Sequence, residues 1–269
     1  MKHFSKILSL IVVMTLVVTL LSSCGEAKKA AKEAYANEVS RIQTEQAYLD
    51  TAITNAQSLV DSKEKPFDET LIPAVQTEIT NAKAMIVEIP EAKGKAEEIE
   101  AIVNNLKQVS YVDETNMLRD LNAKLSDSIK IMKQVTNPSE EFIVSVLQRI
   151  PGVTGYAACT EDHDPNGQLH KPGGYTSCIY GAYDQVHSDW LGNDIVENGT
   201  KGGLAIEVYE TEEAAKNRDN YLAAFDGGIL ASGSHKVVGT VLVRTSDELN
   251  ASQQQELENA IVTQLTTLQ

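Results

Sequence analysis

The sequence predicts an α+β protein: a helical bundle or coiled-coil stalk, residues 24–136, precedes a ferredoxin-like antiparallel sheet with helices on one face, residues 137–269. Two patterns support this prediction. Apolar residues of the front half recur every three or four positions, as in amphipathic helices, whereas several short runs of the back half alternate, as in strands. The composition changes at Asn137-Pro138, which places the domain boundary there.

A leader precedes both domains. Lys2 and Lys6 open the chain, residues 7–21 carry no charge, and small polar residues follow. This uncharged stretch is shorter than the roughly 20 residues that a helix needs to cross a bilayer core. Residues 1–23 are therefore typical of a cleaved secretory signal and not of a permanent membrane span.

The leader ends in Leu21-Ser22-Ser23-Cys24, which resembles the lipobox of bacterial lipoprotein signals. The resemblance implies that Cys24 is acylated and becomes the first residue of the mature chain. Because each buried methylene contributes ~0.8 kcal/mol, two or three acyl chains would hold the protein on a membrane. We expect a lipid-anchored protein on the extracellular face of the cell membrane; the alternative is a secreted protein with a chance cysteine.

The composition limits the choice of partners. The whole chain has a net charge of −15, and removing residues 1–23, which hold two lysines and no acid, changes this to −17. Phosphate backbones and anionic lipid head groups repel such an acidic body, which argues against nucleic acid as a partner and against a basic docking surface. The expected contacts are the membrane, through the lipid on Cys24, and a surface protein or glycan.

Four apolar stripes predict four helices in the front half. The first would be a rod from about residue 27 to 61, spanning roughly 50 Å at 1.5 Å per residue. The second should begin close to Thr70 and end before Pro90, and the other two carry stripes over residues 99–109 and 118–132. We expect all four to pack as antiparallel bundle helices.

Residues 49–109 resemble a FIVAR-type module of Gram-positive surface proteins. The resemblance rests on "LDTAITNAQSLV", "LIPAVQTEITNAKAMI" and "AEEIEAIVNNLKQV", which are separated by a polar break and by a break that contains proline. It implies a stalk or binding spacer and brings no catalytic residues. The alternative is an unrelated helical bundle.

The back half is predicted to contain three helices and four strands. The helices lie in "PSEEFIVSVLQRI", "TEEAAKNRDNYLAAF" and "NASQQQELENAIVTQLTTL". The order α-β-β-β-α-β-α suggests an antiparallel sheet covered on one face, as in a ferredoxin-like variant. The strand candidates are residues 153–160, 175–183, 204–209 and 237–244.

The run "GLAIEVYETEEAAKNRDNYLAAFDGGILASGSHKVVGTVLVRTSDEL" resembles the carboxy-terminal domains of uncharacterised lipoproteins from Gram-positive bacteria. In those proteins too, a helical front half precedes an α+β domain. The resemblance implies this architecture and a surface location, and it brings no functional site.

The loop "DHDPNGQL" is the best candidate for a ligand site. Asp162, Asp164 and Asn166 occupy alternate positions before Gly167, as in the first part of a calcium-binding loop, and Gln168 adds a fourth possible oxygen ligand. These residue types supply the carboxylate and amide oxygens that a hard cation prefers. The loop therefore predicts a weak calcium site.

The match to a calcium loop is incomplete. Gly173 occupies the position of the bidentate glutamate, so another acid, such as Asp184 or Glu197, would have to complete the shell. The flanking segments also read as strands instead of helices. The alternative is an ordinary turn, because Asp, Asn, Pro and Gly favour loop conformations.

Cys159, His163, His170 and Cys178 are four possible zinc ligands within twenty residues. Their spacing matches none of the short pairings of structural zinc sites, so zinc is not expected. The two cysteines have two other possible states. They could form a disulfide that closes an eighteen-residue loop and contributes ~3 kcal/mol, or they could be buried thiols on neighbouring strands.

Two further features do not predict a site. Ser234 and His235 are adjacent in an extended stretch, so their side chains point to opposite faces and make a poor catalytic pair. Trp190 is the chain's one tryptophan, and a single aromatic residue is more often part of a core than a ligand anchor.

These observations predict a lipid-anchored surface protein that binds or scaffolds and has no catalytic residues and no cofactor other than possible calcium. The alternative is an extracellular, metal-assisted enzyme that acts at the loop of residues 162–169. A solute-binding lipoprotein is disfavoured, because a back half of about 130 residues has no second lobe to close over a ligand.

Overall fold

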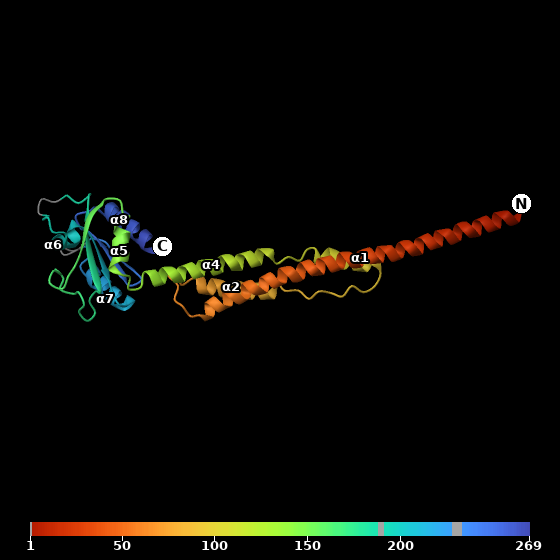
Figure 1. Cartoon of the computed structure of the whole chain (residues 1–269), viewed down its shortest axis with the longest axis horizontal. Coiled ribbons are helices and arrows are strands. Elements are labelled where there is room, and N and C mark those ends of the chain that lie inside the picture. Colours follow the sequence, from red (N-terminus) through yellow and green to blue (C-terminus); the bar gives the residue numbers. More distant parts are fainter. Residues whose placement is uncertain (1, 188–190, 228–232) are drawn as a thin grey trace. The chain divides into compact units, whose positions relative to one another are not determined.

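The computed structural model describes residues 2–187, 191–227 and 233–269, with side chains from residue 25 onwards. Over these residues the chain forms eight α-helices, one short 3-10 helix and a five-stranded antiparallel sheet (Figure 1). The predicted α+β class is therefore confirmed. The chain divides into two compact units, one of Met1–Glu64 with Thr70–Leu125 and one of Lys65–Glu69 with Ser126–Gln269.

The first unit contains the four helices that the apolar stripes predict. They are α1 (Lys2–Asp61), α2 (Leu71–Ala84), α3 (Ala96–Leu106) and the first part of α4 (Val112–Gln134). Each contributes the apolar side chains of its stripe to the interior, which explains why the periodicity located them. The buried residues are Ile42, Leu49, Ile53, Ala56, Val75, Ile79, Ala82, Ile99, Val103, Leu106, Leu118 and Leu125.

The predicted antiparallel packing of all four helices is wrong. The guanidinium of Arg41 donates to the carbonyl oxygen of Leu106 at 3.0 Å, and that of Arg119 lies 5.9 Å from the ring centroid of Tyr48. The contacts thus advance together along the two segments: Arg41 lies beside Leu106, and the later residue Tyr48 lies beside the later residue Arg119. The α3–α4 segment therefore runs in the same direction as α1. Only α2 returns along α1.

A non-helical segment, residues 85–95, makes this arrangement possible. The hydroxyl of Tyr35 donates to the carbonyl oxygen of Pro90 at 2.9 Å, and the N–H of Val87 donates to the hydroxyl oxygen of Tyr111 at 3.1 Å. A non-helical chain covers more length per residue than a helix. A few residues after α2 therefore reach Tyr35 on α1, from where α3 can run in the same direction as α1. The sequence indicated only a short break here.

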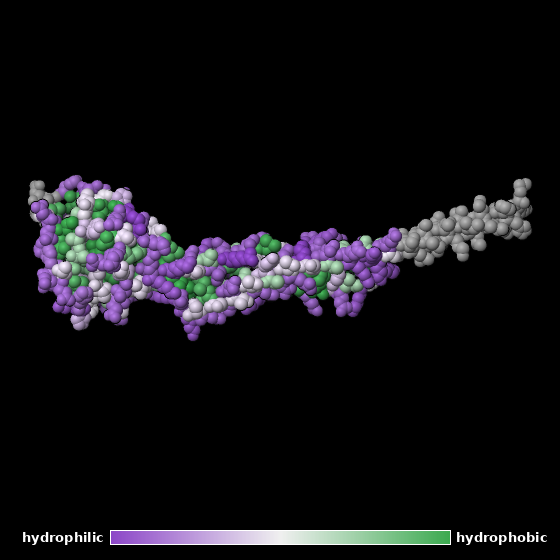
Figure 2. Space-filling view, viewed as in Figure 1, coloured by the Kyte–Doolittle hydropathy of each residue, from purple (hydrophilic) through white to green (hydrophobic). Residues whose placement is uncertain are grey.

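The surface of the first unit is mainly hydrophilic and carries small apolar patches (Figure 2). Tyr48, Val112 and Met117 are large apolar or aromatic side chains that remain exposed. Where the structure describes the helices, none has an apolar stretch long enough to cross a membrane. Side chains before Gly25 are not described, so the predicted lipidation of Cys24 lies outside the described residues.

The second unit is built on one antiparallel sheet with the strand order β1-β2-β3-β5-β4. The last turns of α4 also belong to it, so its main segment begins at Ser126, before the predicted boundary after residue 136. Its elements are α5 (Glu140–Leu147), β1 (Val153–Ala158), β2 (Ser177–Tyr183), α6 (Ile195–Asn198), η1 (Gly199–Gly202), β3 (Gly203–Val208), α7 (Glu212–Ala223), β4 (His235–Val238), β5 (Val241–Thr245) and α8 (Ala251–Thr266).

The strand predicted over residues 237–244 is in fact the hairpin of β4 and β5. Val238 pairs with Val241, and the two residues between them make the turn. Gly239 has φ +62, a conformation that glycine adopts without steric cost, and a Cβ there would lie 2.5 Å from atoms of Val135. The alternation of valines predicts one continuous strand across Gly239, although an isolated glycine between strand residues can mark a turn.

The prediction that helices cover one face of the sheet is also wrong, because both faces are covered. On the first face, the α5/α8 face, Ile179 and Ile206 of the sheet are in one apolar cluster with Leu147 of α5 and Ile261 of α8. On the second, the α7 face, Leu242 belongs to a different cluster with residues of α6, α7 and the loop between β1 and β2. Those partners are Val196, Ala215, Leu222, Leu169 and Tyr175.

Candidate functional site

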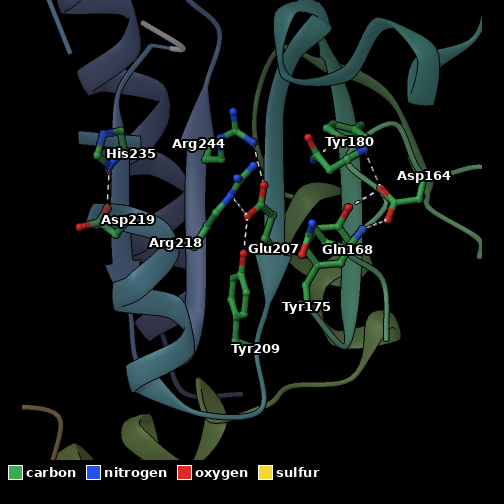
Figure 3. A network of polar contacts seen from close by, with 11 residues as sticks. Asp164, Gln168, Tyr175, Tyr180, Glu207, Tyr209, Arg218, Asp219, His235 and Arg244 are labelled. Atoms are coloured by element: carbon green, nitrogen blue, oxygen red, sulfur yellow. Dashed lines mark hydrogen bonds and ion pairs between the residues drawn. The ribbon is translucent and has the colours of Figure 1, made fainter. Parts of the chain in front are cut away.

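The loop between β1 and β2, residues 160–176, is organised around the carboxylate of Asp164. This group accepts hydrogen bonds from the backbone N–H of Asn166 at 3.1 Å, of Gln168 at 2.7 Å and of Leu169 at 2.8 Å. It also accepts one from the hydroxyl of Tyr175, a side chain that is fully buried (Figure 3). Four donors therefore converge on one carboxylate and close the loop on itself.

The electrostatics of this loop follow from burial and hydrogen bonding. Burial alone would raise the pKa of Asp164, but the hydrogen bonds from Tyr175 and the backbone outweigh it, so the pKa is lowered. Burial raises the pKa of Tyr175, and its hydrogen bond to Asp164 raises it further. Asp164 is thus a charged acceptor and Tyr175 a neutral donor at neutral pH.

The structure gives the predicted calcium ligands different surroundings. Asp162 and Gln168 have exposed side chains, whereas the amide of Asn166 donates to the hydroxyl oxygen of Tyr180 at 2.9 Å. The contacts of Asp164 are those of the turn alternative, since they stabilise local backbone. Among the residues that the structure describes, no group of three His, Cys, Asp or Glu side chains is placed to hold a metal ion. Calcium binding stays a prediction.

The four side chains considered as zinc ligands are not brought together. The ring of His163 contacts the carboxylate of Glu197 at 2.8 Å and so connects the loop to α6. The ring of His170 contacts the carboxylate of Glu161 at 3.1 Å, within the same loop. Each histidine therefore has its own acidic partner.

The two cysteines lie side by side at the start of the loop. Cys159 directly follows β1, and its N–H donates to the carbonyl oxygen of Cys178 on β2 at 2.8 Å. Both are buried and both are free in the structure. A hydrogen bond between the two side chains raises the pKa of Cys178, and burial raises it further.

A buried ionic cluster lies beside this loop on the α7 face, and sequence reasoning missed it. Glu207 of β3 has no exposed surface, and its carboxylate accepts from Arg244 of β5 at 2.7 Å and from Arg218 of α7 at 3.3 Å. The hydroxyl of Tyr209 donates to the same carboxylate at 2.7 Å (Figure 3). We call Glu207, Tyr209, Arg218 and Arg244 the Glu207 cluster.

Two guanidinium groups share one carboxylate in the Glu207 cluster. Burial lowers the pKa of Arg218, but the charge of Glu207 outweighs it and the pKa is raised. Burial and the same charge raise the pKa of Tyr209. The Nε of Arg244 is buried and has no hydrogen-bond partner in the described part of the chain. Such a desolvated cluster depends on every member being present, because removing one leaves the others unpaired.

Glu207 does not stand out in the sequence. In "GLAIEVYE", Leu204, Ile206 and Val208 alternate, a pattern that groups these three side chains on one face and says nothing about what covers the other. The structure buries every residue of β3. The signal that could have found the cluster is the near-continuous apolar character of residues 203–208, which is typical of a strand buried on both faces.

Ser234 and His235 are not a catalytic pair, as their spacing indicated. The hydroxyl of Ser234 lies 2.8 Å from that of Thr245. The ring of His235 lies 2.6 Å from the carboxylate of Asp219 on α7 and 3.4 Å from that of Asp226. The histidine therefore ties β4 to α7. Trp190, the other feature noted in the sequence, lies outside the described residues.

A surface hollow of about 630 Å³ lies next to the loop. It is lined by Asn137, by residues 170–176, by Glu210 and Thr211 just before α7, and by Ala214 in its first turn. Its wall is held firmly, since the N–H of His170 donates to the carbonyl of Tyr175 at 2.9 Å. The lining mixes backbone with polar and charged side chains. Such a lining, partly apolar and partly polar, suits a ligand that presents both kinds of surface.

The chain was compared with protein-family models, with curated proteins and with solved structures, and none of these comparisons gives a match. The geometry of the loop, the Glu207 cluster and the hollow is therefore the basis for an assignment of function.

Proposed function

We propose that this chain is a lipid-anchored bacterial cell-surface protein that binds or scaffolds and has no catalytic activity. The anchor is the acylated Cys24 at the end of the lipobox-like leader. Residues 25–30 are exposed, and Ala31 is the first buried residue of the helical unit. A short exposed link between the lipid and the folded body would let the anchor insert without disturbing the bundle.

The hollow beside the loop is the observation that carries the binding role. It is about 630 Å³ in volume, its lining combines apolar surface with polar and charged groups, and a loop fixed by four hydrogen bonds to Asp164 forms one wall. A preformed wall reduces the entropy lost on binding. A surface protein or a glycan is the proposed partner, in keeping with the strongly acidic chain.

The finer architecture belongs to this proposal. The helical unit would act as a stalk, with the FIVAR-like module over residues 49–109 as spacer. The second unit would be a ferredoxin-like variant, for which the split β3-α7-β4 unit, with β5 between its strands, is the supporting element. A metal-assisted enzyme at residues 162–169 is less compatible with the geometry, because Asp164 is already committed to four donors.

The anchor is tested by mass spectrometry of the mature protein from the membrane fraction of a producing bacterium. We expect cleavage before Cys24, acyl chains on that residue, and release of a Cys24→Ser variant from the membrane fraction. An unmodified mature terminus, or native protein free in the medium, would contradict the proposal.

The binding role is tested by co-sedimentation of the protein with isolated cell-wall glycan and by cross-linking to surface proteins on intact cells. Lys171 lines the hollow, so Lys171→Glu should weaken binding, whereas Lys107→Glu, an exposed change in the first unit, should not. Equal binding by both variants would remove the hollow from the proposal.

A further inference from the structure

Cys159 and Cys178 are opposite each other on neighbouring antiparallel strands. The paired residues just before them in the register are Ala158 and Ile179, and the N–H of Cys159 donates to the carbonyl oxygen of Cys178 at 2.8 Å. Directly opposed residues in such a ladder have Cα atoms about 4.5–5.5 Å apart. That separation lies within the range of about 4.4–6.8 Å that disulfides span.

Both thiols also point to the same face of the sheet. They belong to one apolar cluster on the α7 face, where Cys159 is 7% exposed and Cys178 is 1% exposed. Opposed side chains of an antiparallel pair lie on the same side of the sheet with their Cβ atoms close together. The register and the shared face therefore place the two thiols where a cross-strand bond is geometrically accessible.

We propose that Cys159 and Cys178 are an oxidation site that forms a cross-strand disulfide and closes the loop of residues 160–177. In this step one S–S bond forms between the cysteines and their two S–H bonds break. The electron pair passes to a low-molecular-weight disulfide, which is reduced to two thiols that take up the two protons. The structure shows the reduced form of the pair.

The order of folding and oxidation follows from the surroundings of the pair. A thiolate is the attacking species, and the hydrogen bond that the Cys178 thiol donates to Cys159, together with burial, keeps the pKa of Cys178 well above its ordinary value. Glu207 lies opposite Cys178 on the adjacent strand, and its negative charge disfavours a thiolate at Cys178. The folded, reduced protein should therefore oxidise slowly, and the bond should form while the loop is still open.

The bond would fix the base of the loop that carries Asp164 and that forms one wall of the hollow. It would reduce the conformational freedom of the unfolded chain, as a cross-link across a loop does. That the protein meets an oxidising compartment depends on the proposed surface location. The geometry of the cysteine pair does not depend on that location, so the cross-link can be tested in a purified system.

The experiment uses the full chain with Cys24→Ser, so that Cys159 and Cys178 are the two cysteines left in the chain. The reduced, denatured chain is refolded in a mixture of oxidised and reduced glutathione, acid-quenched, alkylated and cleaved at Glu161, which lies between the two cysteines. We expect the peptides that carry Cys159 and Cys178 to be joined until reductant is added. Alkylation of both cysteines, mixed disulfides with glutathione, or linked dimers would overturn the proposal.

A second measurement does not depend on variants that might fail to fold. The urea midpoint of the oxidised chain should fall when reductant is added, while that of a Cys159→Ala/Cys178→Ala double variant should not change. Equal midpoints for the oxidised and reduced chain would contradict a constraint on the loop. If the bond forms in the purified chain but not in protein from the cell surface, the proposed location fails and the geometry stands.

Discussion

The two faces of the sheet in the second unit differ in chemistry. On the α5/α8 face, β3 contributes Leu204, Ile206 and Val208 to a cluster of apolar side chains. On the α7 face the same strand contributes Ala205 and Glu207, and the surroundings include buried tyrosines, two thiols and two arginines. One strand thus supplies an apolar core on one side and an ionic centre on the other.

This difference teaches how stability and chemistry are distributed. Burial of apolar surface stabilises in proportion to area and does not depend on any single partner. A buried carboxylate is stable only while its donors are present, so the α7 face depends on complete pairing. The α7 face also holds the loop and the thiol pair, so the proposed binding site and the proposed cross-link both lie on the face that is harder to stabilise.

The largest effect is expected from Glu207→Ala. It leaves Arg244 and Arg218 without their buried counter-charge and Tyr209 without an acceptor, so the free energy of unfolding should fall by about 4 kcal/mol. Urea unfolding measures this loss. Glu210→Ala, an exposed change three residues away, should stay within about 0.5 kcal/mol. A loss no larger than that of the control would mean that the cluster does not stabilise the fold.

The next effect is expected on the opposite face of the same strand. Ile206→Ala removes buried methyl groups and should lower the free energy of unfolding by about 3 kcal/mol, and Ile206→Val by about 1 kcal/mol. The same urea titration ranks these variants against Glu207→Ala. If Ile206→Ala lowers the free energy of unfolding more than Glu207→Ala does, the α7 face is not the one that depends more on a single residue.

A smaller effect is expected from Asp164→Asn, which removes the charge that the loop donors share. At pH 7 the free energy of unfolding should fall by about 2 kcal/mol, and by less in Asp162→Asn, whose side chain is exposed.

The pH dependence of this effect has a defined sign. Folding lowers the pKa of Asp164, so the carboxylate's contribution is complete above its ordinary pKa of 3.8 and is lost as the pH falls through the lower folded value. The difference between the wild type and Asp164→Asn should therefore shrink below about pH 4. Unfolding curves between pH 7 and pH 3 measure it, and a constant difference would assign the loop's stability to other contacts.

The sequence predicted those parts of the fold that local patterns determine. All four helices of the first unit follow from their apolar stripes, because each stripe is a property of its own segment. Their directions could not be predicted, since these depend on residues 85–95, whose few hydrogen bonds reach distant residues such as Tyr35 and Tyr111. The α+β class was also predictable, whereas the hairpin at Gly239 was missed.

The candidate site was predictable only where its residues are close in sequence. Asp164 stood out because it alternates with Asp162 and Asn166 as in a calcium-binding loop, and the hydrogen bonds it accepts are those of the turn alternative. Glu207 did not stand out, because alternation tells which side chains share a face and not whether the other face is covered. The partners that cover it, Arg218 and Arg244, come from two other elements.

The end of α4 and the residue after it have a practical consequence for isolating the second unit. Met132 and Val135 belong to its apolar core, and the carbonyl oxygen of Val135 accepts from the N–H of Thr240 in the β4–β5 turn at 3.0 Å. A recombinant fragment that begins at Pro138 would lose these side chains and leave an amide of the hairpin without its acceptor. A recombinant fragment that begins at Ser126 keeps Met132 and Val135 and is the better starting point for producing this part of the unit alone.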